Sequence, residues 1–145
     1  MSSHKLLKRV QLFAGLKEPE LEKIAAIAEY QKAEPLAVVI HQNTTGSTMY
    51  VVAVGSVEVF IEGYADERSL VVLGQRQVFG EMSLVDYGYR SASVRATEQG
   101  CEYFEIEREA MEALCQENEH IGYIVMRNLA ADLAFKLRHR NLTTT

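Results

Sequence analysis

The sequence has no tryptophan, only two prolines and only two cysteines among 145 residues. Cys101 and Cys115 stand far apart without metal-ligating neighbours, so we interpret both as reduced thiols, while one disulfide between them stays open. No apolar run approaches the about 18 residues that cross a bilayer, and the N-terminus lacks the apolar stretch of a secretory leader. We therefore expect no membrane span and a cytoplasmic location.

Basic residues are also scarce. Fifteen lysines and arginines face 20 acidic residues, which gives a net charge of −5 and a pI near 5.4. A protein whose main partner is nucleic acid needs the opposite balance. The length suits one globular domain with its own core, so we expect a single domain over residues 1–145.

Histidines are few and scattered, and only one of the four falls in an expected strand: His4, His41, His120 and His139. A metal-dependent enzyme of the cupin type would need two or three histidines and a carboxylate on adjacent strands. No Ser-His-Asp or Cys-His arrangement is suggested by proximity either. We therefore expect no metal, no catalytic residues and no enzyme, with the cupin type as an improbable alternative.

Helical patterns occupy both ends of the chain, at about residues 5–30 and 108–141. At the first end we expect a short helix over 6–13 and a second helix ending near Tyr30. At the second end acidic residues gather early and basic residues late, as a helix dipole prefers, and a break near Asn118 divides the segment.

The long helix after that break carries two apolar faces. One face is a stripe with the spacing of a coiled coil, and Ile124, Ala131 and Phe135 line its neighbour. We expect one face to rest on the domain and the other to meet a twin helix in a homodimer; packing of both faces within one subunit is the alternative. The stripe consists of Tyr123, Met126, Ala130, Leu133 and Leu137.

Between the helices, residues 31–107 alternate short β-branched runs with polar, glycine-containing turns. Such spacing favours antiparallel pairing over a parallel sheet. We predict a mainly β fold, an eight-stranded antiparallel β-roll or jelly roll with flanking N- and C-terminal helices. The strand-like runs are 37–40, 50–54, 57–61, 69–73, 91–96 and 102–106.

The most informative segment is Phe79–Ala96, which reads FGEMSLVDYGYRSASVRA. Glu81 follows a glycine at the start of a helical turn, and its carboxylate can accept a sugar hydroxyl. Arg90 can hold a phosphate through two parallel hydrogen bonds, and Ser91 can add a donor. By spacing alone, an acid and an arginine nine residues apart more often form a surface ion pair.

This segment resembles the phosphate-binding cassette of cyclic nucleotide-binding domains. The likeness covers roughly residues 6–141, including LFAGLKEPELEKIA near the start and the turn positions Gly46, Tyr50 and Gly55. It implies that Glu81 binds the ribose and Arg90 the phosphate. The resemblance further implies a cradle lined by Gly80, Met82, Ser83, Ser91 and Ala92.

Departures from the family pattern lie in turns. Leu36 and Asn43 stand where the family usually has glycine, and Thr44 replaces a common acidic residue. Asparagine tolerates the left-handed backbone that such a turn needs, whereas we expect leucine to avoid it. These departures concern loop geometry rather than the cassette.

The ligand and partners follow from the same resemblance. The sequence Arg-Ser-Ala resembles the catabolite activator branch and implies cAMP, although a hydroxyl beside the arginine also occurs in cGMP-selective members. Base contacts in the family often come from the last helix, which indicates Arg138, Arg140 or Asn141; a solvated helix end is the alternative.

We predict a sensor or regulatory domain that prefers cAMP and signals through its C-terminal helix. Catabolite activators continue into a DNA-binding helix-turn-helix, which residues 1–145 lack, so we expect no direct nucleic-acid partner. The effector is then a separate protein or a further domain. The main alternative is a degenerate fold that binds no nucleotide and serves in dimerisation or docking.

Overall fold

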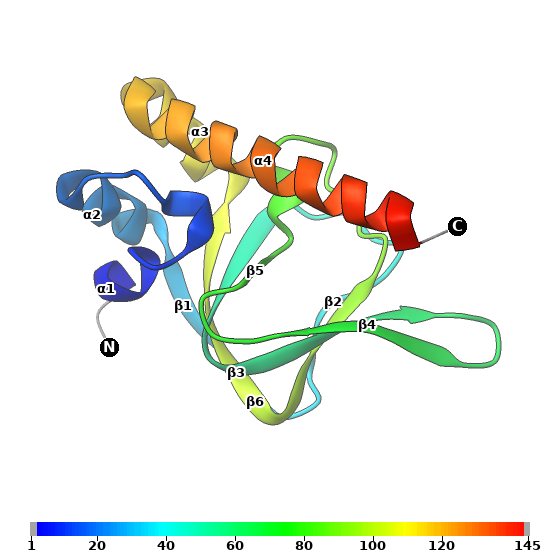
Figure 1. Ribbon diagram of the computed structural model, residues 1–145. Coiled ribbons are helices and arrows are strands. Elements are labelled where there is room, and N and C mark those ends of the chain that lie inside the picture. Colours follow the sequence, from blue (N-terminus) through cyan, green and yellow to red (C-terminus); the bar gives the residue numbers. More distant parts are fainter. Residues whose placement is uncertain (1–2, 144–145) are drawn as a thin grey trace.

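The computed structural model describes residues 3–143, and the side chains of residues 4–139. Its helices gather at one end of a β-roll, and the long last helix crosses over that end (Figure 1). The N-terminal elements are α1 (Ser3–Leu7), the 3-10 helix η1 (Gln11–Phe13) and α2 (Glu18–Ile27). The C-terminal elements are α3 (Arg108–Glu117) and α4 (Glu119–Thr143). No helix among the described residues is long and apolar enough to cross a membrane.

The β-roll is one antiparallel sheet in which the shorter strands pair with two long ones. The strand order is β1-β6-β3-β4, with β2 added to β6 and β5 added to β3. This arrangement confirms the mainly β, jelly-roll-like fold predicted above. Its elements are β1 (Glu29–Ala33), β2 (Val38–Ile40), β3 (Thr48–Glu62), β4 (Glu67–Leu73), β5 (Val78–Phe79), the 3-10 helix η2 (Glu81–Leu84) and β6 (Ser93–Glu107).

The described residues form six strands where eight were expected, and the six runs named from the sequence fall in four of these strands. Runs 50–54 and 57–61 are continuous in β3, residues 93–96 and run 102–106 are continuous in β6, and β1 and β5 were not among the named runs. The β3–β6 register shifts on both sides of Gly55, whose φ is 81°. A Cβ there would lie 2.2 Å from the carbonyl oxygen of Gly100. Such bulges bend a strand without ending it, which is why the sequence pattern suggested two strands.

Three predictions about residues 6–36 need correction. The single helix expected over residues 6–13 is divided into α1 and η1, and Tyr30 belongs to β1, where it pairs with Phe104. Leu36 adopts a left-handed backbone with φ 66°, so the expectation that leucine avoids this conformation is wrong. Its side chain is exposed, and its N–H donates to the Thr97 carbonyl.

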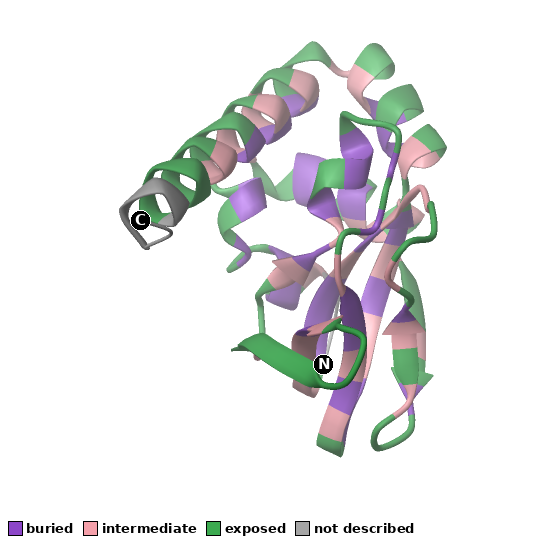
Figure 2. Ribbon diagram, turned by 90° about the vertical axis from the view of Figure 1, so that its right-hand side faces the viewer, coloured by how far each residue is buried: buried purple, intermediate pink, exposed green. Residues whose placement is uncertain are grey.

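The first half of α4 is anchored in the core, whereas residues 134–139 further along the helix are exposed (Figure 2). Ile121, Val125 and Leu129 are buried, one turn apart, and each such side chain contributes about 1.5–3 kcal/mol. These three residues form the centre of the inward face, and two members of the stripe, Met126 and Leu133, are partly buried against the same core. Tyr123 and Leu137, which belong to the stripe, are exposed on the outward face.

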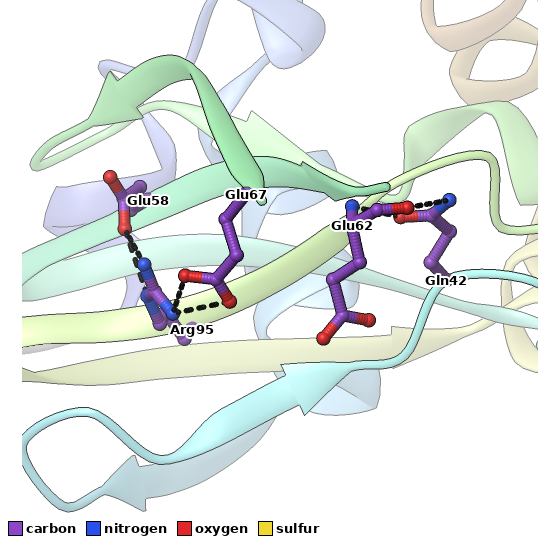
Figure 3. A network of polar contacts seen from close by, with 5 residues as sticks. All are labelled: Gln42, Glu58, Glu62, Glu67 and Arg95. Atoms are coloured by element: carbon purple, nitrogen blue, oxygen red, sulfur yellow. Dashed lines mark hydrogen bonds and ion pairs between the residues drawn. The ribbon is translucent and has the colours of Figure 1, made fainter. Parts of the chain in front are cut away.

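Arg95 joins the β3–β4 hairpin to β6 (Figure 3). Its guanidinium lies between the carboxylates of Glu58 and Glu67 and 4.1 Å from the ring centroid of Phe60. Nearby, the Glu62 N–H donates to Gln42 Oε1 over 2.7 Å. Paired charges and a ring contact thus hold the hairpin to β6 along its length, up to Glu67 beside the turn.

Candidate functional site

A cavity of about 370 Å³ opens between the β-roll and α4, within the size range of small-ligand sites. One wall is apolar and comes from β3, β4 and β5 through Val59, Val71, Leu73 and Val78. All seven residues predicted for the cradle also line this cavity, together with a lysine from α4. These are Gly80, Glu81, Met82, Ser83, Arg90, Ser91, Ala92 and Lys136.

Backbone pairing between two loops holds Arg90 in place. Its N–H donates to the Thr44 carbonyl and its own carbonyl accepts from the Asn43 N–H, both over 2.8 Å. Its Nη2 donates to the Thr48 carbonyl over 2.8 Å. The residue is only 8% exposed. The guanidinium is therefore fixed at the cavity wall rather than in solvent.

Two glycines leave room for this guanidinium. A Cβ at Gly46 would lie 2.7 Å from Arg90 Nη2, and a Cβ at Gly80 would lie 2.9 Å from Arg90 Nη1. Gly80 also has a φ of 72°, which other residues rarely adopt. The glycine of the FGE motif is thus required both by the turn into η2 and by the position of the arginine.

Arg90 differs from the other buried charges in its ion pairing. Among the described residues, no carboxylate forms an ion pair with it. Burial raises the pKa of the adjacent Tyr50 phenol, and the positive charge of Arg90 acts in the opposite direction. A buried cation without an anion is costly, so this site is electrostatically suited to an anionic ligand.

Glu81 presents one engaged and one unengaged carboxylate oxygen. It is the first residue of η2 and is 7% exposed. Its Oε1 accepts from Lys136 Nζ over 3.1 Å, whereas Oε2 is buried without a hydrogen-bond partner. An unsatisfied buried acceptor costs about 1–3 kcal/mol, which a ligand hydroxyl would recover.

Lys136 is the site residue that the sequence reasoning missed. Its ammonium pairs with Glu81 and, over 2.9 Å, with Asp132 one turn earlier on α4. Partial burial alone would lower the pKa of Lys136, but the two carboxylates outweigh it and the pKa is raised. The spacing of Asp132 and Lys136 is typical of a helical ion pair, and only the path of α4 over the roll shows that the lysine faces the cavity.

The other predicted residues differ in what they present to the cavity. The Ser83 hydroxyl donates to the Gly80 carbonyl over 2.6 Å and so supports η2. Ser91 is exposed at the rim. Arg138 is exposed and is not part of the cavity lining, and the side chains of Arg140 and Asn141 lie outside the described residues. The part of the chain with described side chains has no cluster of histidine, cysteine or acidic residues that could hold a metal ion.

Comparisons with known proteins agree with this geometry. The family model described as cyclic nucleotide-binding domain matches residues 30–118. The chain is 36% identical over 140 residues to the cyclic AMP receptor protein of Thermus thermophilus, covering 94% of this chain and 61% of that protein. It is 30% identical over 110 residues to the cGMP-dependent protein kinase egl-4 of Caenorhabditis briggsae, covering 74% of this chain and 15% of the kinase.

Solved structures of cyclic nucleotide-related regulators also superpose on this chain. The crystal structure of the Thermus thermophilus catabolite activator protein superposes with a TM-score of 0.81 at 35% identity, covering 91% of this chain and 60% of that one. The regulatory domain of Toxoplasma gondii PKA, solved with cAMP, superposes with a TM-score of 0.71 at 25% identity. The match covers 78% of this chain and 43% of that one. The chain thus spans less than two thirds of the length of these similar proteins.

Proposed function

Because this chain belongs to the cyclic nucleotide-binding domain family, we propose that it binds a 3′,5′-cyclic mononucleotide in the cavity beneath α4. One observation supports this most strongly. A buried cation without a counter-charge and a buried carboxylate with an unengaged oxygen line the same cavity and do not pair with each other. A cyclic nucleotide carries the two groups that would satisfy both.

In this proposal Arg90 holds the phosphate and Glu81 the sugar. The guanidinium donates to the exocyclic oxygens of the phosphodiester and neutralises its single charge. The ribose 2′-hydroxyl donates to Glu81 Oε2. The apolar wall of Val59, Val71 and Leu73 accommodates the base. The cradle residues Gly80, Met82, Ser83, Ser91 and Ala92 complete the site.

We favour cAMP over cGMP as the ligand. The similarity to a cyclic AMP receptor protein extends over 94% of this chain, and the Toxoplasma gondii domain was solved with cAMP. The similarity to cGMP-dependent kinases is lower, at about 30% identity over a shorter part of the chain. The proposal is therefore a cAMP sensor without catalysis of its own, located in the cytoplasm.

Signalling would pass through α4, because this helix contributes Lys136 to the cavity. A ligand shifts the position of the helix only if it contacts one arrangement better than another. Exposed Tyr123, Phe135 and Leu137 on the outward face support a homodimer through α4. A separate effector protein or a further domain would then receive the change.

A thermal unfolding experiment with cAMP and cGMP tests the proposal. Saturation at about 100 times the dissociation constant stabilises a fold by about 2.7 kcal/mol, which raises the Tm by several degrees for a domain of this size. We expect this shift with cAMP and a smaller shift with cGMP at equal concentration. If millimolar concentrations of both leave the Tm unchanged, the domain is a degenerate one that serves in dimerisation or docking.

A further inference from the structure

We propose that Lys136 positions Glu81 for the sugar, and thereby gives the site its preference for ribose over 2′-deoxyribose. Lys136 lies on α4, outside the cassette that carries the other polar contacts. This inference rests on the nucleotide-binding function proposed above. It assigns Lys136 a positioning role, through Glu81, rather than a contact with the phosphate.

The two oxygens of Glu81 carry the argument. Nζ of Lys136 donates to Oε1, and Oε2 has no hydrogen-bond partner. The lysine and a sugar hydroxyl would therefore bind different oxygens of the carboxylate and would not compete. A carboxylate with a side chain only 9% exposed needs a counter-charge to be stable in its site. Among the described residues, Lys136 is the cation that forms an ion pair with Glu81. Without it, Glu81 has no partner that fixes the direction of Oε2.

The lysine is itself held in place from the other side. Asp132 Oδ2 lies 2.9 Å from Nζ, one turn earlier on the same helix. Lys136 also borders a second cavity of about 220 Å³, lined by Arg76, Gln77 and Asn128. Its side chain therefore stands between two cavities, and its position depends on how α4 lies on the roll.

This arrangement links the sugar contact to the helix. A ligand that needs Glu81 oriented by Lys136 binds better when α4 is docked, and by reciprocity its binding holds α4 in place. The neighbouring residues 134–139 are exposed, so the Lys136–Glu81 pair lies in a part of α4 with little burial of its own. Loss of the pair should therefore weaken sugar recognition without unfolding the domain.

The test measures the dissociation constants of cAMP and 2′-deoxy-cAMP by calorimetry for the wild type and for Lys136→Met. We expect the wild type to prefer cAMP by about tenfold to a hundredfold, the usual effect of one hydrogen bond to a charged group. Lys136→Met should lower this ratio to about twofold, and Lys136→Arg should restore most of it, since the counter-charge returns. Lys136→Gln, which retains a donor, serves as a second variant if the methionine variant does not fold.

Arg127→Met is the matched control, because it removes one positive charge from an exposed position of the same helix. This variant should keep the wild-type ratio of the two dissociation constants. A general effect of charge on α4 would lower the ratio in Arg127→Met as well. If the wild type prefers cAMP and Lys136→Met keeps that preference, the positioning role is wrong while the proposed function stands. If the wild type binds neither nucleotide, the proposed function fails as well.

Discussion

Arg90 and Arg95 lie in one short segment of the chain, yet their guanidinium groups have opposite surroundings. Arg95 donates from Nε to Glu58 over 2.8 Å, contacts Glu67 over 3.2 Å and covers the Phe60 ring. Arg90 donates to the carbonyl of Thr48, and none of the described carboxylates pairs with it. The more deeply buried of the two cations is thus the one without an anion.

This difference distinguishes a structural arginine from one reserved for a ligand. Paired and partly exposed, Arg95 ties the β3–β4 hairpin to β6 at little electrostatic cost. An unpaired buried charge opposes folding, so its retention suggests a function that the fold alone does not supply. Substitution of Arg95 should therefore affect stability, and substitution of Arg90 should affect binding.

The largest effect is expected from Arg90→Ala. Removal of one partner of a buried charge pair costs about 2–5 kcal/mol, so cAMP affinity should fall at least about thirtyfold. The free energy of unfolding should change little, because the variant removes a buried charge that has no counter-ion. Calorimetric titration and chemical denaturation measure the two quantities on the same samples.

Arg95→Ala provides the contrast for that experiment. It should retain cAMP affinity within about threefold, since Arg95 does not line the cavity, and should lower the stability by about 1–3 kcal/mol. Equal loss of affinity in both variants would mean that the two arginines do not differ in role.

A smaller effect is expected from Gly46→Ala. The new methyl group would lie 2.7 Å from Arg90 Nη2 and displace the end of this flexible side chain rather than the backbone. We expect cAMP affinity to fall about tenfold, equivalent to about 1.4 kcal/mol, while stability changes by less than about 1 kcal/mol. Gly74→Ala is the control, because its Cβ would have no atom within 4 Å. Unchanged affinity in Gly46→Ala would show that the position of the guanidinium does not matter.

The smallest effect is expected on the pH dependence of folding stability, through the ion pair of Glu58 with Arg95. Hydrogen bonds from Arg95 and from Ser69 hold the pKa of Glu58 below its ordinary value of 4.5. A lowered folded-state pKa means that the pair stabilises the fold above about pH 4.5 and loses this effect as the pH falls further. At pH 7 Glu58→Gln should therefore be less stable than the wild type by under about 1 kcal/mol. Denaturation at pH 7 and pH 3 should show the difference closing; a constant difference would contradict the assignment.

The sequence predicted the cassette because its chemistry is local. Glu81 and Arg90 belong to one continuous motif, and its resemblance to the family's phosphate-binding cassette named them where their spacing alone did not. Strand boundaries were less predictable, because a bulge at Gly55 and a turn between strands have the same composition. The left-handed Leu36 was missed for a related reason, since its conformation is fixed by the strands on either side rather than by its own preference.

Lys136 was beyond sequence reasoning because its role depends on packing. The buried residues Ile121, Val125 and Leu129 determine which side of α4 faces the roll, and that rotation brings Lys136 to Glu81. The sequence left open which of the two apolar faces rests on the domain, and Arg138 was named only because the family resemblance indicates base contacts from the last helix. A long helix with two apolar faces does not reveal from sequence which one is buried.

A crystal structure of the domain with cAMP tests the central claim most directly. We expect the exocyclic phosphate oxygens within about 3 Å of the Arg90 guanidinium and the ribose 2′-hydroxyl at the same distance from Glu81 Oε2, with Lys136 still on Oε1. A phosphate bound elsewhere, or a guanidinium that still faces only the Thr48 carbonyl beside the bound nucleotide, would contradict it.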